Sequence, residues 1–259
     1  MSVEEMIGLM FTEHNSIPAK LRPHGAAIAD LVRQVARALR RGGRVFYVGA
    51  GTSGRLGVLD ASECPPTFST DPELVQGIVA GGHEALWKSL EGAEDDAVAG
   101  RREVVSRKVG RSDVVIGIAA SGTTPFVWGA LGAAKRRGAI TALICFNPHL
   151  SIPTAIKPKV VLAPNLGPEM LTGSTRLKAG TATKLLLNII STLAMVRLGK
   201  VMGNFMIDVA ASNTKLRERA VRMVAELTDS ERTVAQEALR SERWRVRDAV
   251  RRLGRKQGV

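Results

Sequence analysis

The sequence has few residues of the kinds that bind metals or form disulfide frameworks. Its 259 residues include two cysteines, Cys64 and Cys145, and four histidines. Two thiols in a chain of this length are typical of reduced residues in a cytoplasmic protein. The histidines lack the spacing of metal ligands, so we expect no metal site.

Aromatic residues and long apolar runs are also scarce. Aromatic residues make up 4% of the chain, and the three tryptophans are too dispersed for a base-stacking platform. The longest apolar run, residues 185–196, is interrupted by polar residues and is shorter than the roughly 18–20 residues that cross a bilayer. The N-terminus lacks the basic and apolar regions of a secretory signal. We therefore expect a cytoplasmic protein with no membrane partner.

Acidic residues are outnumbered by basic ones, 24 to 37, which gives a formal net charge of +13. A field of this sign attracts phosphates, nucleic acids and anionic lipids alike. Much of the basic excess falls after residue 229, with the spacing of a solvated helix. Because no nucleic-acid-reading motif accompanies it, nucleic acid is an unlikely partner. We expect a main domain over residues 1–228 and a basic helical tail over residues 229–259.

The apolar pattern predicts an α/β fold. Short β-rich runs at residues 44–48, 76–80, 113–118, 140–145 and 159–162 alternate with segments of helical periodicity. This alternation is typical of parallel strands joined by crossover helices. One helix is expected over residues 25–41, before the first strand, and a C-terminal helical extension is expected over residues 175–198 and 207–227.

Two of the expected strands are followed by a hydroxyl-rich turn and then a helix. The first turn, residues 49–54, satisfies G-x-G-x-x-G and contains Thr52 and Ser53. No acidic residue ends the next strand, which argues against a dinucleotide. A phosphate monoester gains from hydroxyls, backbone N–H groups and a helix N-terminus together. The pattern favours a phosphate monoester, with a dinucleotide site and a purely structural turn as alternatives.

The second turn, residues 121–124, offers the same chemistry, although its hydroxyls are equally suited to capping a helix that begins at Pro125. A third hydroxyl-rich turn follows at residues 173–181. There Ser174 or Thr175 is expected to cap the long apolar helix, and Lys178 to point into the same pocket. The candidate substrate-binding residues are Gly51, Thr52, Ser53, Ser121, Gly122, Thr123, Thr124, Ser174, Thr175 and Lys178.

Five segments together resemble a known family: residues 49–66, 91–95, 117–122, 173–181 and 203–209. They are similar to the N-acetylmuramic acid 6-phosphate etherases, members of the sugar isomerase (SIS) domain superfamily. The resemblance implies a five-stranded parallel sheet in flavodoxin-like order and a homodimer with shared active sites. It also implies release of D-lactate from the C3 ether of N-acetylmuramic acid 6-phosphate, leaving N-acetylglucosamine 6-phosphate, in cell-wall amino-sugar recycling. No metal or redox cofactor is implied.

The resemblance also assigns two catalytic carboxylates. Glu63 matches the proton donor to the departing lactate, and Glu94 matches the second carboxylate, which acts as base at C2 or toward water. Glu91, three residues earlier on the same helix face, is the competing candidate for the second role. Pro65 and Pro66 are expected to fix the exit of a turn that carries Glu63. At Thr123 many relatives carry arginine, whose loss would weaken contact with an anionic group.

Two other functions remain open. One is a non-catalytic sugar-phosphate sensor, like the related glucokinase regulatory protein, but a sensor has no need for two acid–base glutamates. The other is a sugar-phosphate isomerase, which has no lactate to protonate and so no need for Glu63.

Overall fold

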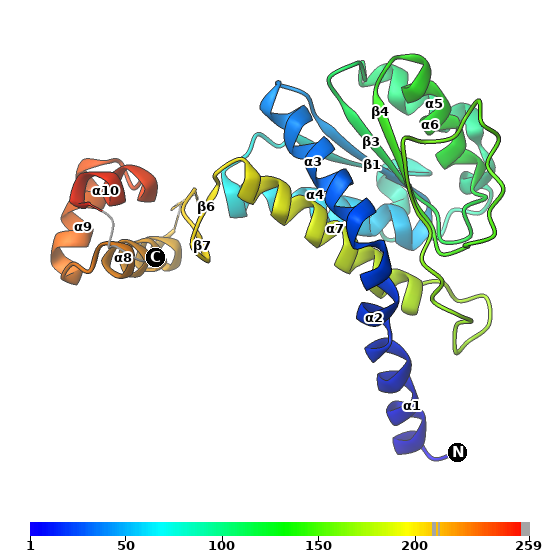
Figure 1. The fold of residues 1–259 in the computed structure, drawn as a ribbon, viewed down its shortest axis with the longest axis horizontal. Coiled ribbons are helices and arrows are strands. Elements are labelled where there is room, and N and C mark those ends of the chain that lie inside the picture. The colour runs from blue at the N-terminus through cyan, green and yellow to red at the C-terminus, as the bar shows by residue number, and fades with distance from the viewer. Residues whose placement is uncertain (209–210, 212, 255–259) are drawn as a thin grey trace. The chain divides into compact units, whose positions relative to one another are not determined.

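The chain folds into two compact units, shown in Figure 1, a ribbon drawing of the computed structural model. The structure describes residues 1–208, 211 and 213–254. The first unit comprises residues 1–62 and 73–194, and the second comprises residues 63–72 and 195–259. The division predicted from the sequence, a main domain to residue 228 and a basic tail after it, stays a prediction. Val209 of the matched segments and Arg255 and Lys256 of the predicted tail lie outside the described residues.

A five-stranded parallel sheet forms the centre of the first unit. Its order is β2-β1-β3-β4-β5, which confirms the predicted flavodoxin-like sheet. The strands are β1 (Val45–Gly49), β2 (Val75–Val79), β3 (Val114–Ile118), β4 (Ile140–Ile144) and β5 (Val160–Leu162). Every predicted strand is present, with ends shifted by one residue at most, because buried parallel strands are short, nearly continuous apolar runs.

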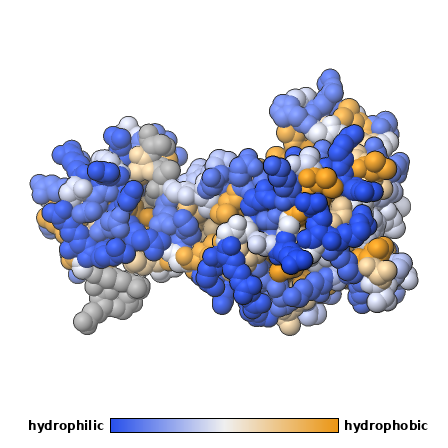
Figure 2. All heavy atoms as spheres, turned by 90° about the horizontal axis from the view of Figure 1, so that it is seen from above, coloured by the Kyte–Doolittle hydropathy of each residue, from blue (hydrophilic) through white to orange (hydrophobic). Residues whose placement is uncertain are grey.

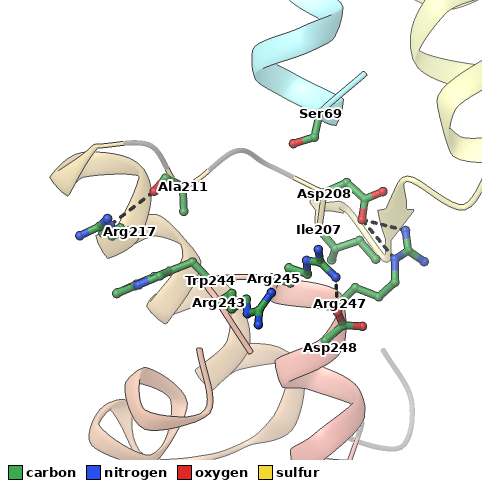
Figure 3. A pocket seen from close by; sticks show the side chains of 10 residues that line it. All are labelled: Ser69, Ile207, Asp208, Ala211, Arg217, Arg243, Trp244, Arg245, Arg247 and Asp248. Carbon is green, nitrogen blue, oxygen red and sulfur yellow. Dashed lines mark hydrogen bonds and ion pairs between the residues drawn. The ribbon is translucent and has the colours of Figure 1, made fainter. Parts of the chain in front are cut away.

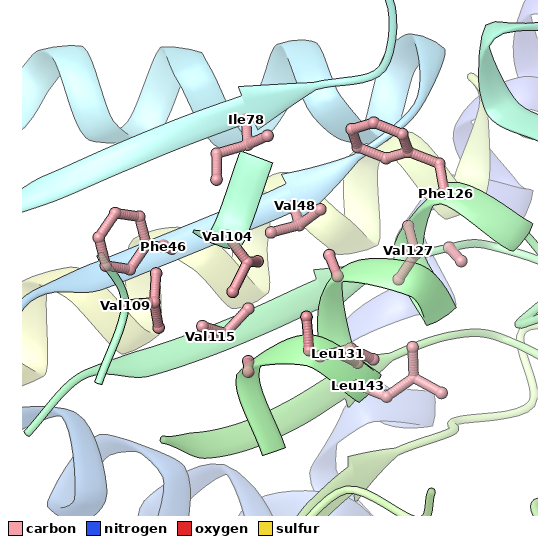
Figure 4. Packing of buried hydrophobic residues seen from close by; sticks show 14 of the residues in the cluster. Phe46, Val48, Ile78, Val104, Val109, Val115, Phe126, Val127, Leu131 and Leu143 are labelled. Carbon is pink, nitrogen blue, oxygen red and sulfur yellow. The ribbon is translucent and has the colours of Figure 1, made fainter. Parts of the chain in front are cut away.

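Helices cover both faces of this sheet. Figure 1 shows α5 (Ala97–Ser106) and α6 (Pro125–Arg136) on one side, and α3 (Gly25–Arg40), α4 (Gly51–Phe68) and α7 (Lys178–Arg197) on the other. The core between the sheet and α5 and α6 includes Phe46, Val115, Phe126 and Leu131, all buried (Figure 4). Three short 3-10 helices complete the unit: Arg22–His24, Gly82–Leu86 and Ala93–Asp95.

The N-terminus adds α1 (Val3–Asn15) and α2 (Ile17–Leu21). Ser2 and Glu5 form a capping box at the start of α1, yet no residue of α1 is buried. Several of its apolar side chains face solvent, among them Ile7 and Phe11. Hydrophobic areas also lie among the hydrophilic residues of the face seen in Figure 2.

Helix α4 corrects one prediction. Pro65 and Pro66 lie inside the helix, which continues to Phe68, so Glu63 is helical and not in a turn. The prolines fall in the last turns, where their missing N–H groups leave only the carbonyls of Ala61 and Ser62 without helical partners. The helix ends at Ser69, which has a φ of 48° and donates its N–H to the Pro65 carbonyl at 2.9 Å.

Helix α7 is longer than the apolar run seen in the sequence. By length and composition alone its 20 residues are apolar enough to cross a membrane, but 56% of the apolar window is buried inside the protein. Ile190 and Ala194, for example, are completely buried. This burial is typical of a core helix.

The second unit has a hydrophobic core of its own. A small hairpin, β6 (Val201–Met202) and β7 (Phe205–Met206), precedes α8 (Thr214–Thr228), α9 (Arg232–Ser241) and α10 (Val246–Leu253). The helix predicted over 207–227 is present as α8, which starts later, at Thr214, and the predicted basic helical tail forms α9 and α10, which bury apolar side chains and are not solvated all round. Small and branched residues on α9 and α10, such as Ala235, Leu239 and Val250, are buried in one cluster with Val224 of α8.

Candidate functional site

The first hydroxyl-rich turn directs the start of α4 to the carboxyl edge of the sheet. Gly51, the first residue of α4, has a φ of 51°. A Cβ on Gly49 would lie 2.6 Å from the Gly54 nitrogen, so the end of β1 and the first turn of α4 approach too closely for a side chain. Thr52 and Ser53 follow in that first turn, where backbone N–H groups lack helical partners. The arrangement suits a bound anion.

The second turn lies at the same edge, because β1 and β3 are parallel neighbours with Gly49 opposite Ile118. The Ser121 Oγ is 2.8 Å from the Thr123 Oγ1 and accepts the Thr123 N–H at 3.2 Å. Gly122 has a φ of 80°, and its carbonyl accepts the Trp128 indole N–H at 2.7 Å. Thr124 occupies the N-cap position of α6 without a capping bond from its side chain, so the expected hydroxyl cap is absent there.

Glu94 lies in a cavity beside the first turn. The cavity has a volume of about 160 Å³, and its lining includes Ala50 and Gly51 after β1, Ala80 after β2, and both Glu91 and Glu94. Glu94 belongs to the 3-10 helix Ala93–Asp95, which follows Gly92 in the left-handed region. The Glu94 carboxylate and the glycine-rich turn at Gly51, the predicted phosphate-binding turn, thus line one cavity.

Arg55 attaches the segment before Glu91 to the first turn of α4. Its guanidinium donates to the carbonyls of Ala85, Leu86 and Lys88 at 2.9, 3.1 and 2.8 Å. A planar guanidinium with several N–H donors suits such a multiple bond. The wall of the cavity that contains Glu94 is therefore fixed relative to Gly51 by one side chain.

The third turn packs near the first, but its capping differs from the prediction. Helix α7 begins at Lys178, and the Glu169 carboxylate accepts the N–H groups of Lys178 and Ala179, both at 2.9 Å. Ser174 and Thr175 therefore do not cap it, because the turns that contain them end before the helix begins. A Cβ on Gly180 would lie 3.5 Å from the Thr52 Cγ2 and 3.7 Å from the Thr175 carbonyl oxygen.

Lys178, at the start of α7, is paired with an acidic residue of α1. Its side chain is 2% exposed and its ammonium forms an ion pair with Glu13 of α1. The hydrogen bond and the charge of Lys178 lower the pKa of Glu13.

A second cavity, of about 540 Å³, lies between α4 and α7. Its lining includes Thr52, Arg176, Thr181 and Lys184. Two cationic groups and two hydroxyls therefore face this space beside the first turn.

A buried carboxylate joins α4 to α7 and β1. Asp60 accepts hydrogen bonds from the Tyr47 hydroxyl at 3.0 Å, the Asn188 amide at 2.8 Å and the Ser191 hydroxyl at 3.1 Å. Burial raises the pKa of Asp60, and these hydrogen bonds oppose the rise.

Glu63 is exposed on α4 and is not among the residues that line the cavity of Glu94. It lies about three helical turns beyond Gly51, or about 18 Å along an ideal helix.

Sequence reasoning missed several polar residues of this region. Arg55 follows the glycine-rich motif directly, and Asp60 and Arg176 lie within the segments that resemble the family, whereas Lys184 and Glu169 have no local signal. Within the described part of the chain, no group of three or more His, Cys, Asp or Glu could hold a metal ion. Cys64 and Cys145 are both buried, and burial raises the pKa of Cys145.

The chain contains a SIS domain, as its match to a family model shows. Residues 27–135 match the N-terminal SIS domain of the glucokinase regulatory protein, and residues 203–252 match its C-terminal lid domain. Among solved structures, a putative phosphosugar isomerase from Bacteroides fragilis covers 78% of this chain and 95% of its own, with a TM-score of 0.57 and 17% identity. A phosphoheptose isomerase from Neisseria gonorrhoeae covers 76% and 100%, with a TM-score of 0.53 and 17% identity. At these identities the similarity shows the fold alone.

Curated relatives are much more similar in sequence. The N-acetylmuramic acid 6-phosphate etherase of Gloeobacter violaceus is 54% identical over 245 residues, which are 95% of this chain and 79% of the relative. The protein of the same name from Klebsiella aerogenes is 49% identical over 239 residues, 92% of this chain and 79% of the relative. The chain belongs to the N-acetylmuramic acid 6-phosphate etherase family.

Proposed function

We propose that this protein is a carbon–oxygen lyase that cleaves the D-lactyl ether of N-acetylmuramic acid 6-phosphate. The products are N-acetylglucosamine 6-phosphate and D-lactate, and the reaction serves cell-wall amino-sugar recycling in the cytoplasm. The observation that carries the proposal is the shared cavity of Glu94 and the glycine-rich turn at Gly51, in a chain about half identical to curated etherases.

The chemistry requires a base, an acid and a fixed phosphate. An unactivated ether resists hydrolysis, but opening the sugar ring places an aldehyde at C1 and acidifies the proton on C2. A base removes that proton, the C3–O bond breaks, and an acid protonates the leaving lactate oxygen. Water then adds across the resulting double bond, with hydroxyl at C3 and a proton at C2. Binding of the distal phosphate positions these carbons.

Two carboxylates divide the proton transfers. In this proposal Glu94 is the base at C2 or toward water, and Glu63 is the acid for the lactate oxygen. The phosphate and sugar contact the three hydroxyl-rich turns, in which the proposed ligands are Gly51, Thr52, Ser53, Ser121, Gly122, Thr123, Thr124, Ser174, Thr175 and Lys178. The reaction needs no metal or redox cofactor.

A second copy of the chain completes the site in this proposal. Glu63 lies about 18 Å along α4 from Gly51 by ideal helix geometry, so a partner that supplies its own Glu63 resolves the separation. The apolar side chains of α1, such as Ile7 and Phe11, are exposed in the single chain. Such side chains favour coverage by another protein surface, and a homodimer with shared active sites supplies one.

The direct test is release of D-lactate. Purified protein incubated with N-acetylmuramic acid 6-phosphate should yield D-lactate, measured with a D-lactate dehydrogenase. Glu94→Gln and Glu63→Gln should each lower kcat on the order of 10²- to 10⁴-fold, with substrate binding largely kept. Glu91→Gln is the matched control, because Glu91 lines the same cavity and should remain active.

Two outcomes would overturn the proposal. Binding of the substrate without any lactate release would indicate the sensor function. Full activity of Glu63→Gln or Glu94→Gln, or loss of activity in Glu91→Gln instead, would remove the assigned roles.

A further inference from the structure

The second unit contains a cavity that none of the proposed active-site residues lines. It has a volume of about 560 Å³ and is bordered by α8, the connection between α9 and α10, and the start of α10. Figure 3 shows the side chains of Arg217, Trp244 and Arg247 around it. A volume of this size accommodates a small metabolite.

The residues that line the cavity carry more positive charge than their own aspartates neutralise. Four arginines and two aspartates border the cavity. Asp208 already has two cationic partners, Arg247 at 2.9 Å and Lys200 at 3.0 Å. Asp208 therefore leaves the remaining arginines unneutralised.

The other aspartate neutralises little of this charge. Asp248 contacts Arg245 only at 3.9 Å and Arg251 at 3.7 Å. The guanidinium of Arg243 forms no ion pair or hydrogen bond within residues 1–208, 211 and 213–254. Arg243 and Arg245 are both exposed, so both guanidinium groups are available to a ligand.

The backbone holds this lining in an uncommon conformation. Arg243 and Trp244 have φ values of 52° and 63°, two consecutive left-handed residues of which neither is glycine. Each such residue costs free energy that glycine would avoid. The backbone N–H of Trp244 donates a 2.7 Å hydrogen bond to the Leu239 carbonyl. The Arg217 guanidinium lies 5.0 Å from the centroid of the Trp244 ring. The turn therefore presents two arginines and an indole to one cavity.

We propose that this cavity is a second binding site, for a small phosphate-bearing metabolite. Guanidinium groups bind phosphate oxygens through paired hydrogen bonds, which suits Arg243 and Arg245. Trp244 supplies an apolar surface for the organic part of the ligand. None of the residues that line it is a proposed active-site residue, and the proposal does not depend on the etherase reaction.

NMR of the indole N–H groups tests the proposal in the whole protein, because each of the three tryptophans lies in a different part of the chain and gives its own resonance. Trp244 lines the cavity, whereas Trp128 donates to Gly122 at the sheet edge. Uniformly ¹⁵N-labelled protein is titrated separately with inorganic phosphate, glucose 6-phosphate and adenosine monophosphate, and Trp244→Phe assigns the resonance. A saturable shift of the Trp244 signal with at least one probe is expected, and comparison of the three probes shows which part of the ligand matters.

Charge variants supply the control. The double variant Arg243→Gln, Arg245→Gln should weaken the Trp244 response about tenfold or more. Arg240→Gln removes an equally exposed charge of α9 outside the cavity and should leave the response unchanged. Equal responses in the double variant and Arg240→Gln would overturn the proposal. So would a Trp244 signal unmoved by all three probes at millimolar concentration. Lactate release plays no part in this readout, so failure here is distinct from failure of the proposed function.

Discussion

The Tyr47 hydroxyl on β1 donates a 3.0 Å hydrogen bond to the Asp60 carboxylate on α4. Both side chains are buried, at 1% and 7% exposure. With the two donors from α7, this carboxylate joins one strand and two helices that are distant in sequence.

We expect Asp60→Ala to lower the free energy of unfolding by about 2–4 kcal/mol, because two buried donors and one partly buried donor lose their acceptor. Urea unfolding at neutral pH measures the change. Asp30→Ala is the control, since the Asp30 side chain on α3 is 42% exposed and its ion pair with Arg33 is long, at 3.7 Å. This substitution should change stability by less than about 0.5 kcal/mol. Equal effects of the two substitutions would contradict the structural role of Asp60.

Asp60 should also give a characteristic pH dependence. Its pKa is raised above the ordinary 3.8 by burial, so its contribution to stability is fully present below pH 3.8 and is lost as the pH rises through the folded value. The unfolding free energy of the wild type relative to Asp60→Asn should therefore fall as the pH rises above 3.8. A difference that stays constant or rises would contradict the raised pKa.

Glu13 should show the opposite dependence. Its pKa is lowered from 4.5 by Lys178, so its stabilising contribution is present above pH 4.5 and is lost as the pH falls through the folded value. Glu13→Gln should be less stable than the wild type at pH 7, because the buried Lys178 ammonium loses its charged partner. Thermal unfolding over a pH series should show this difference shrinking in acid. Glu5→Gln, on the same helix but far from Lys178, is the comparison.

Arg55→Lys should reduce kcat/KM for lactate release by about 10- to 100-fold, because a lysine cannot hold three carbonyls at once and the cavity wall with Glu94 becomes misplaced. Faster hydrogen exchange over residues 82–95 should accompany the loss. Arg101→Lys, at an exposed position of α5, should affect neither measurement. Reduced activity without faster exchange would indicate that Arg55 contacts the substrate and does not position the wall.

Thr123→Arg should lower KM for the substrate by about 3- to 10-fold, because it supplies a guanidinium and so a charge-assisted bond to an anionic group. Steady-state kinetics of lactate release measure it. Thr154→Arg adds the same charge at an exposed loop position and should leave KM unchanged. An unchanged KM for Thr123→Arg would show that this position does not face the anion.

Local patterns were sufficient for the central sheet. All five strands were predicted, and so was helix α3 with its buried face of Ile28, Leu31, Val32, Val35 and Leu39. In these segments a local apolar pattern, continuous in the strands and periodic in α3, indicates most of the buried residues. The glycine-rich turn was also predictable, because its composition reflects the close approach of Gly49 and Gly54.

Features that depend on distant partners were not predictable. We predicted that Pro65 would end the helix, but near a helix end the two prolines leave only two carbonyls without partners. The free-energy cost of that loss is small compared with the gain from packing Cys64 and Phe68, which are both buried. The hydrophobic core of the C-terminal helices could not be predicted from the basic sequence. The small residues Ala235, Ala238 and Ala249 form a buried face only because they pack with α8. The cap of α7 required Glu169, which lies outside the hydroxyl-rich turn where a cap was sought.

The Glu169 carboxylate at the start of α7 has a further consequence. It is an internal anion at a position where an external one would otherwise bind, and it occupies the amides of Lys178 and Ala179. A sugar phosphate at the sheet edge therefore has the N-terminal amides of α4 and α6 available, whereas the Lys178 and Ala179 amides are already occupied. Removal of the Glu169 carboxylate should accordingly destabilise the start of α7 and free two amides for an external anion.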